Sequence, residues 1–201
     1  MRQRLHLDIL SQPGTCRHRR PDGSCCGAPL DTKGSHAIGC SIGGWVVKRH
    51  NAIVDAVANW VVSYCDCTVF KEQVMPNASE GHNEARMDLI VHSPHVAGGL
   101  HIDITVVSAL SVEALAKGSA LHDGVAANLA TSRKERKYAG CEVYAFPIEA
   151  HGRIGSTAST VIRMLAPQSS SERSRAISAI YQDIASILQR WNADSILAPI
   201  G

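Results

Sequence analysis

Two aspartates inside apolar segments are the residues of this chain that point most directly to chemistry. Asp88 lies within 85–91 (ARMDLIV) and Asp103 within 100–107 (LHIDITVV). A carboxylate in such a strand is costly unless a cation or hydrogen bonds compensate it. The short connection 93–99 makes the two strands neighbours in one sheet, so we expect both carboxylates at one end of it, where they would bind Mg²⁺. The alternative is that each aspartate ends its strand and is satisfied by a loop.

Three other positions add to this acidic pair. Glu72, on the preceding predicted strand, offers a third carboxylate, unless it is an ordinary exposed strand residue. Arg49 and His50 lie in a predicted helix, where either side chain can contact a phosphate or orient a ligand. The alternative for His50 is a core histidine, because apolar residues follow it at helical spacing.

A predicted basic helix supplies the cation that the acidic pair needs. Lys134 and Lys137 are three residues apart, which places them on one helix face, with Tyr138 beside them. Metal-dependent hydrolysis of a phosphodiester uses acidic ligands and a cation that stabilises charge on the phosphorus. The alternative is a basic helix that only faces solvent.

A separate cluster of metal-ligand residues precedes these elements. Four ligands make a closed structural zinc site, and five candidates are present: Cys16, Cys25, Cys26, His36 and Cys40. Cys26, His36 and Cys40 are the firmest, and the fourth ligand is either Cys25 or Cys16. A segment this short, with almost no apolar periodicity, needs such a staple in order to fold.

The composition limits the classes of protein to which this chain can belong. The chain has 201 residues, 45% of them hydrophobic but only 4% aromatic, which predicts one aliphatic domain with a small appendage. The net charge is only +2, but basic residues cluster, as in the run Arg17, His18, Arg19 and Arg20. Such clusters are what a nucleic-acid backbone meets. With clustered cysteines, no visible signal peptide and no membrane-length apolar run, we expect an intracellular, nuclear protein that has no membrane partner.

The elements that must position these residues follow from periodicity and from glycines and prolines. We predict helices over 45–64, over 111–138 with a break at Gly118 or Gly124, over 156–165 and over 171–191, and strands over 68–74 and 141–148 beside the two aspartate strands. A polar loop covers 76–84, Ser169 and Glu172 have capping-box spacing, and 194–201 form a frayed end. The order predicts an α/β fold around one small mixed sheet. The domains would be a tail over 1–14, a zinc knuckle over 15–44, a core over 45–166, and a last helix with its tail over 167–201.

The order and spacing of these motifs resemble the C-terminal end of non-LTR retrotransposon reverse transcriptase polyproteins. There, a zinc knuckle precedes a restriction-endonuclease-like domain of the PD-(D/E)xK type. The matching motifs are the segment from Cys26 through His36 to Cys40, Arg49-His50-Asn51, Arg86-Met87-Asp88, Asp103 with the apolar run after it, and Lys134 through Lys137 to Tyr138. The resemblance covers roughly residues 16 to 150, and it depends on order and spacing, because no single motif is specific.

The resemblance implies a restriction-endonuclease-like core (helix, three strands, helix, strand) with extra C-terminal helices. Asp88 and Asp103 would bind catalytic Mg²⁺, Lys134 or Lys137 would be the catalytic lysine, and the protein would nick target DNA. DNA would be the partner, together with the RNA template of a retroelement, and the chain would belong to a longer polyprotein. Structural zinc, with Arg17, Arg19, Arg20, Arg49, His50 and Arg86, would support nucleic-acid binding.

Two departures from the motif leave other functions open. Met87 replaces a proline that only shapes a turn, whereas Thr105 stands where the ordinary motif has lysine, two residues after the second acid. Cleavage then depends on the helix lysine. The alternative function is a catalytically inactive nucleic-acid-binding remnant of the same fold, and a third is a zinc-stapled interaction protein with no nucleic-acid role.

Overall fold

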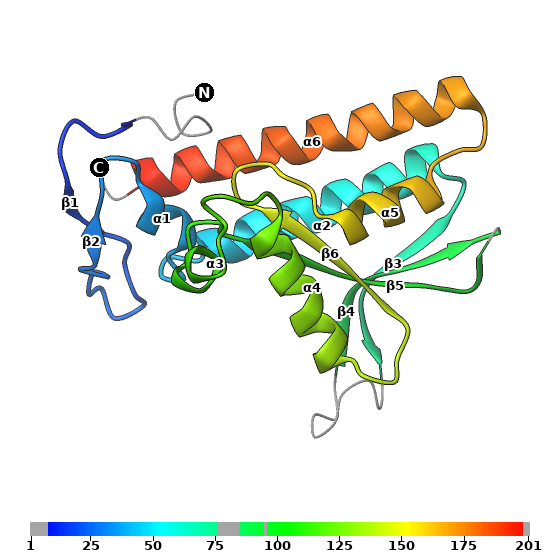
Figure 1. The fold of residues 1–201 in the computed structure, drawn as a ribbon, viewed down its shortest axis with the longest axis horizontal. Coiled ribbons are helices and arrows are strands. Elements are labelled where there is room, and N and C mark those ends of the chain that lie inside the picture. Colours follow the sequence, from blue (N-terminus) through cyan, green and yellow to red (C-terminus); the bar gives the residue numbers. More distant parts are fainter. Residues whose placement is uncertain (1–7, 76–84, 95, 199–201) are drawn as a thin grey trace.

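The computed structural model describes residues 8–75, 85–94 and 96–198 of the chain (Figure 1). Its centre is a sheet of four strands in the order β3-β4-β5-β6. The strands are β3 (Thr68–Met75), β4 (Ala85–Ser93), β5 (Val96–Val107) and β6 (Val143–Glu149). β3 and β5 each run antiparallel to β4, while β5 and β6 are parallel. The mixed α/β class predicted from the sequence is confirmed.

The sheet forks between its two middle strands. The last pairs joining β4 to β5 at this end are Ile90 with His101 and Leu89 with Ile102. Beyond them β4 continues along β3 as far as Ala85, whereas β5 continues along β6 as far as Val107. Asp88 and Asp103 are therefore the first residues past the last pair, one on each arm of the fork.

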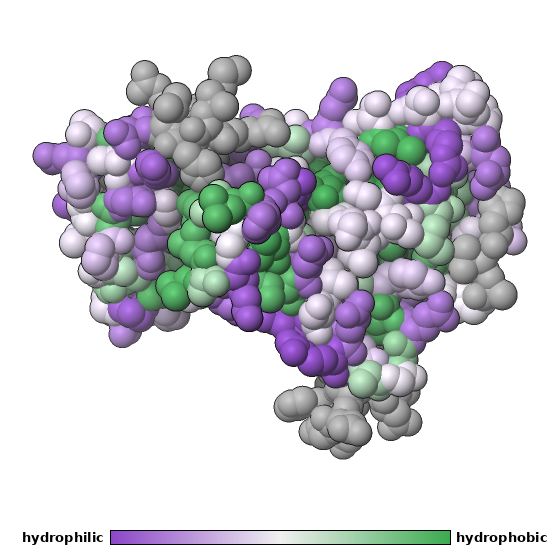
Figure 2. Space-filling view, viewed as in Figure 1, coloured by the Kyte–Doolittle hydropathy of each residue, from purple (hydrophilic) through white to green (hydrophobic). Residues whose placement is uncertain are grey.

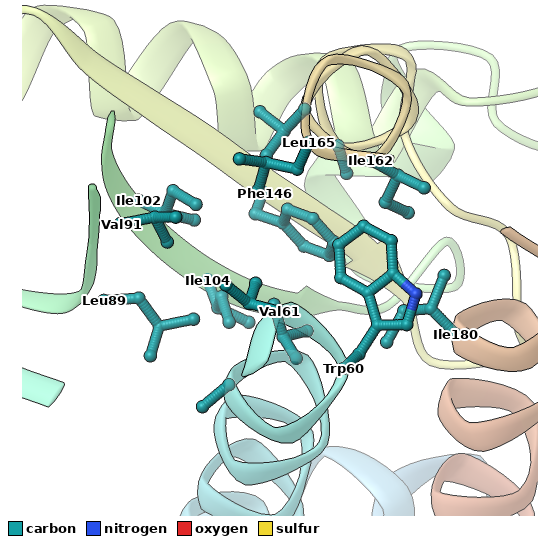
Figure 3. Close-up of a cluster of buried hydrophobic side chains, with 14 of the residues drawn as sticks. Trp60, Val61, Leu89, Val91, Ile102, Ile104, Phe146, Ile162, Leu165 and Ile180 are labelled. Atoms are coloured by element: carbon teal, nitrogen blue, oxygen red, sulfur yellow. The ribbon is translucent and has the colours of Figure 1, made fainter. Parts of the chain in front are cut away.

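One face of the sheet is covered by α2 (Trp45–Tyr64), α5 (Ser156–Leu165) and α6 (Ser170–Leu197). The apolar positions of α2 recur at helical spacing, so one face of the helix is buried against the sheet and α6. Figure 3 shows Trp60 and Phe146 at the centre of this cluster, and the Trp60 indole donates to the Ala176 carbonyl of α6 at 2.7 Å. The core is otherwise aliphatic, as the composition predicted.

The other face carries α4 (Val125–Lys137). Side chains alternate across a strand, so Ile102 belongs to the core under α2 whereas Asp103 meets α4. The buried residues of α4 are the small Ala126, Ala127 and Ala130, which allow the helix to approach β6 closely. Gly124 begins the helix with a φ of 76°, and together with the short α3 (Val112–Ala116) it produces the predicted interruption of the helical segment 111–138.

The N-terminal segment is small and irregular. It contains β1 (Gly14–Thr15), which pairs with β2 (Pro29–Leu30), and α1 (Ser35–Gly39). Residues 8–10 of the predicted tail join this segment, because the Ile9 and Leu10 amides donate to the Thr32 carbonyl. The remaining tail residues 1–7, the predicted loop 76–84 and the last residues 199–201 lie outside the described residues.

Two details predicted for the last helix are wrong. The helix does not fray at 194, because Ser195 and Ile196 are buried and Ile196 packs with Leu30 and Ile38 of the N-terminal segment. Ser169 is the N-cap residue, but its side chain makes no capping hydrogen bond and instead contacts the Ser171 hydroxyl at 3.4 Å. No helix in the described ranges is both long enough and apolar enough to span a membrane.

Candidate functional site

Asp88 is the first residue of β4 beyond the last pair with β5, so it lies where the two strands separate. Its Oδ2 accepts the Ile104 amide N–H of β5 at 2.6 Å, a backbone donor that β4 no longer pairs. The His50 Nε2 of α2 lies 3.4 Å from the same oxygen. The carboxylate thus ties the open end of β5 to α2, which satisfies a backbone group that the divergence would otherwise leave unpaired.

Asp103 lies on the opposite arm and is buried, with 6% of its surface exposed. The Lys134 Nζ of α4 contacts both of its oxygens at 2.8 Å, and the Tyr138 hydroxyl donates to Oδ2 at 2.6 Å. A buried carboxylate needs such compensation. Of the two lysines that the sequence left open, Lys134 is therefore the one that directly contacts Asp103.

Lys134 and Tyr138 reach Asp103 together because they are four residues apart at the end of α4. Tyr138 is buried beside Met87, and burial together with the hydrogen bond to Asp103 raises the pKa of the Tyr138 hydroxyl well above its ordinary value. The Lys137 Nζ donates to the Tyr138 oxygen at 2.8 Å. Lys137 therefore acts on Asp103 only through Tyr138, a link that the sequence showed only as proximity.

The surroundings of His50 favour its protonated form. Its Nε2 faces Asp88 and lies 3.1 Å from the Ile104 carbonyl, while Nδ1 lies 3.2 Å from Asn51 Oδ1. The hydrogen bond to Asp88 outweighs desolvation and raises the pKa of His50 to about 9. The imidazolium thus orients Asp88 rather than packing as a neutral core residue.

The other predicted neighbours lie differently. Glu72 is 68% exposed, and its carboxylate lies 3.6 Å from the exposed Arg86 guanidinium. Among the described residues no third acidic ligand atom gathers with Asp88 and Asp103, so the role of Glu72 stays a prediction without a supporting contact. Arg49 is buried, and its guanidinium donates to Asn192 Oδ1 at 2.6 Å, so its contact with a phosphate stays a prediction.

A second site lies in the N-terminal segment. The Sγ atoms of Cys16, Cys26 and Cys40 and a ring nitrogen of His36 all lie within 4.8 Å of one another, a group that could hold a metal such as zinc. Cys16 Sγ is 3.9 Å from Cys40 Sγ, and Cys26 Sγ is 3.4 Å from His36 Nε2. A tetrahedral zinc ion with ordinary bond lengths separates two sulfurs by about 3.8 Å, and a sulfur from a nitrogen by about 3.5 Å. The donor set therefore fits zinc.

The fourth member of this group, left open by the sequence, is Cys16. Cys25 is exposed and lies outside the group, so its inclusion among the zinc ligands is corrected. The reason is local: Cys25 pairs with Arg19 in a narrow hairpin, and neighbouring residues of an extended chain point in opposite directions, so only Cys26 faces inward.

The residues of the basic run 17–20 likewise differ in exposure. Arg17, Arg19 and Arg20 are exposed, but His18 is buried and its Nε2 lies 2.8 Å from the Ser195 carbonyl of α6. His18 therefore docks the segment onto α6 and does not belong to the basic surface. Arg20 also stabilises its own hairpin by donating to the Cys25 carbonyl at 2.7 Å.

A second group of exposed basic residues lies on α4. Figure 2 shows hydrophilic side chains gathered over the C-terminal part of this helix, where Arg133, Arg136 and Lys137 are exposed. They are close in sequence to the half-buried Lys134, and Arg133 is paired with Glu113 of α3, so Arg136 and Lys137 are the basic side chains here that have no carboxylate partner among the described residues.

Comparison with known proteins adds no identification. No family model matches the chain, and no curated protein is significantly similar to it.

Proposed function

We propose that this protein is a Mg²⁺-dependent DNA endonuclease of the restriction-endonuclease-like type that nicks target DNA and derives from a retroelement. One observation carries the proposal: the fork of the sheet sets Asp88 and Asp103 on its two arms, with the Lys134 ammonium 2.8 Å from both Asp103 oxygens. Two acids and one cation at a strand end form the minimal set for metal-assisted phosphodiester hydrolysis.

The carboxylates retain room for a cation. The two oxygens of a carboxylate offer about four acceptor positions. Asp103 uses three of them, two for Lys134 and one for Tyr138. Mg²⁺ needs only one or two protein carboxylates beside water and phosphate oxygens. Bound there, Mg²⁺ would polarise the scissile phosphate and lower the pKa of an attacking water.

The surrounding residues have distinct tasks in this proposal. Lys134 stabilises the negative charge that develops on phosphorus, in place of the lysine that the motif has at the position of Thr105. His50 holds Asp88, and Tyr138 holds Asp103, so both carboxylates keep fixed orientations. The exposed Arg17, Arg19 and Arg20 contact the phosphate backbone, which gives salt-dependent binding with little sequence preference.

A nicking assay on duplex and branched DNA, with Mg²⁺ or Mn²⁺ and zinc-loaded protein, tests the proposal. Asp88→Asn and Asp103→Asn should abolish cleavage, and Lys134→Met should slow it by about 100-fold or more. The exposed ion pair of Asp55 and Lys71 provides controls, because Asp55→Asn and Lys71→Met remove the same kinds of charge from side chains that bond to each other and not to Asp88 or Asp103. Cleavage that survives the substitutions at the fork would refute the assignment.

The second candidate is a catalytically inactive DNA-binding protein with the same architecture. The observation that favours it is that Lys134 and Tyr138 already satisfy Asp103 within the protein, as a purely structural network would. In that case the parent binds DNA but cuts it with neither metal. Replacing Arg17, Arg19 and Arg20 with glutamine would then weaken binding and reduce its salt dependence, while substitutions at the fork would leave binding unchanged.

A further inference from the structure

Arg49 is a buried cation without a counter-ion. It lies on the inner face of α2 with only 4% of its surface exposed. Within the described part of the chain it forms no ion pair, and its one hydrogen bond goes to Asn192 Oδ1, which is neutral. Its Nε is buried with no partner. A guanidinium carries five N–H donors, so most of its binding capacity is unused.

This arrangement is unfavourable for the isolated protein. Desolvation lowers the pKa of Arg49 to about 10, which reflects the cost of keeping the charge away from water. Buried charges in proteins are ordinarily paired with an opposite charge or with several hydrogen bonds. Asn192 cannot supply more, because its amide nitrogen already donates to the Ala150 carbonyl at 2.7 Å. An anion from outside would supply the missing partner.

A cavity of about 400 Å³ lies beside Arg49, between α1, α2 and the segment that follows β5. Arg49 lines it, and no acidic residue does. The lining includes Ser35, Ser108 and Ser111. The Ser108 and Ser111 hydroxyl oxygens accept backbone N–H bonds at 3.1 and 3.2 Å, which leaves both hydroxyl hydrogens able to donate.

The remaining lining consists of His36, which also belongs to the Cys/His group, and of residues without polar side chains, among them Ile38, Val46, Val106 and Leu110. Small-molecule sites typically measure about 300–1,000 Å³ and combine an apolar wall with a few convergent polar groups. The cavity is too large for an inorganic anion alone and suits a charged group with an organic body attached.

We propose that this cavity binds a phosphate monoester the size of one nucleotide, with its phosphate at Arg49 and the two serine hydroxyls and its organic part against the apolar wall. On this basis, and resting on the proposed nuclease function, the natural ligand is the phosphorylated end of a nucleic-acid strand. The site is distinct from the fork, because Asp88, Asp103 and Lys134 do not line it.

The test measures binding to the zinc-loaded full chain by calorimetry, with a nucleoside 5′-monophosphate, the uncharged nucleoside and inorganic phosphate as probes. The monophosphate should bind, and the nucleoside should bind at least tenfold more weakly. Arg49→Met should abolish the difference while leaving the protein folded, since it removes an unpaired buried charge but keeps the volume. Equal binding of nucleoside and monophosphate would overturn the proposal.

A second variant does not depend on Arg49. Gly39 lines the cavity, and a Cβ atom added to it would lie in open space, with no unfavourable φ to strain the new side chain. Gly39→Leu should therefore fill the cavity and block binding, whereas Gly39→Ala should not. Monophosphate binding that survives Gly39→Leu would refute this location.

Binding of oligonucleotides with a 5′-phosphate or a 5′-hydroxyl then shows whether the phosphate belongs to a strand end or to a free nucleotide. A preference of at least fivefold for the phosphorylated strand, lost in Gly39→Leu, supports a strand end. Monophosphate binding without that preference supports the phosphate site and overturns the strand-end ligand. Neither result depends on cleavage. Failure of the nuclease proposal is measured in the nicking assay, so it can be distinguished from failure of the phosphate site, which is measured by binding.

Discussion

At the scale of the residue, the two carboxylates differ in what holds them. Asp103 meets a lysine and a tyrosine from α4, whereas Asp88 meets a backbone amide and a histidine from α2. Asp103 is therefore tied to α4, and Asp88 to α2 and to the backbone of β5. A substitution at either network tests local energetics independently of whether the protein cuts DNA.

Tyr138→Phe removes the hydrogen bond to the buried Asp103 carboxylate, together with the bond that Lys137 donates to the tyrosine oxygen. We expect the free energy of unfolding to fall by about 1.5–3 kcal/mol, because bonds to charged groups are worth more than neutral ones. Urea denaturation measures the change. Tyr144→Phe is the matched control, since the Tyr144 hydroxyl bonds to Glu142 in an exposed position and its loss should cost about 1 kcal/mol or less. Equal effects would show that the buried network is no stronger than a surface one.

The His50–Asp88 contact predicts a dependence of stability on pH. The pKa of His50 is about 9 in the folded protein, against 6.5 for the free side chain. A raised pKa means that the folded state holds the proton more tightly, so the contribution is complete below pH 6.5 and is lost as the pH rises to 9. Without divalent ions, the stability difference between the parent and His50→Gln should shrink over this window. A constant difference would mean that His50 stays neutral in the folded protein.

At the scale of the element, α6 is more than a cover for α2. Its first part joins the main core through Ala176 and Ile180, while its last turn carries Ile196 into the small cluster with Leu30 and Ile38. The helix therefore links the sheet to the Cys/His segment.

Ile196→Ala tests this link. We expect a loss of about 2–5 kcal/mol if the small cluster unfolds with the rest, as for other buried aliphatic truncations. The neighbouring Leu197 is 58% exposed, so Leu197→Ala should change stability by less than about 1 kcal/mol. Hydrogen exchange of amides in 16–40 should accelerate only in Ile196→Ala. Unchanged protection there would show that α6 does not stabilise the segment.

The sequence predicted elements better than it predicted contacts between them. The helices over 45–64 and 156–165 match α2 and α5, because their apolar stripes face one core. The end of α6 was missed because Ile196 finds its partners near the other end of the chain, beyond any local pattern. The burial of Arg49 and the choice of Cys16 over Cys25 depend likewise on tertiary packing, whereas the fork was anticipated only as two carboxylates at one sheet end.

At the scale of the whole molecule, the two larger buried clusters of the described residues differ in how they are stabilised. The main core is a continuous aliphatic cluster between the sheet and three helices. The cluster under the Cys/His segment contains few buried side chains, namely Leu30, Ala37, Ile38, Ala150 and Ile196. So small a core supplies little stability, and we expect the metal to supply the rest.

Metal removal should therefore unfold one part of the molecule and spare the other. A chelator should make 16–40 sensitive to trypsin, at Arg17, Arg19 or Arg20, while circular dichroism keeps most of its helical signal, because α2, α4, α5 and most of α6 belong to the main core. Cys16→Ser should lose zinc and show the same protease sensitivity without chelator, whereas Cys25→Ser should retain one zinc per chain. If Cys25→Ser behaves like Cys16→Ser, the assigned ligand set is wrong. If chelation collapses the helical signal, the two cores unfold as one unit and the Cys/His segment stabilises the fork as well as itself.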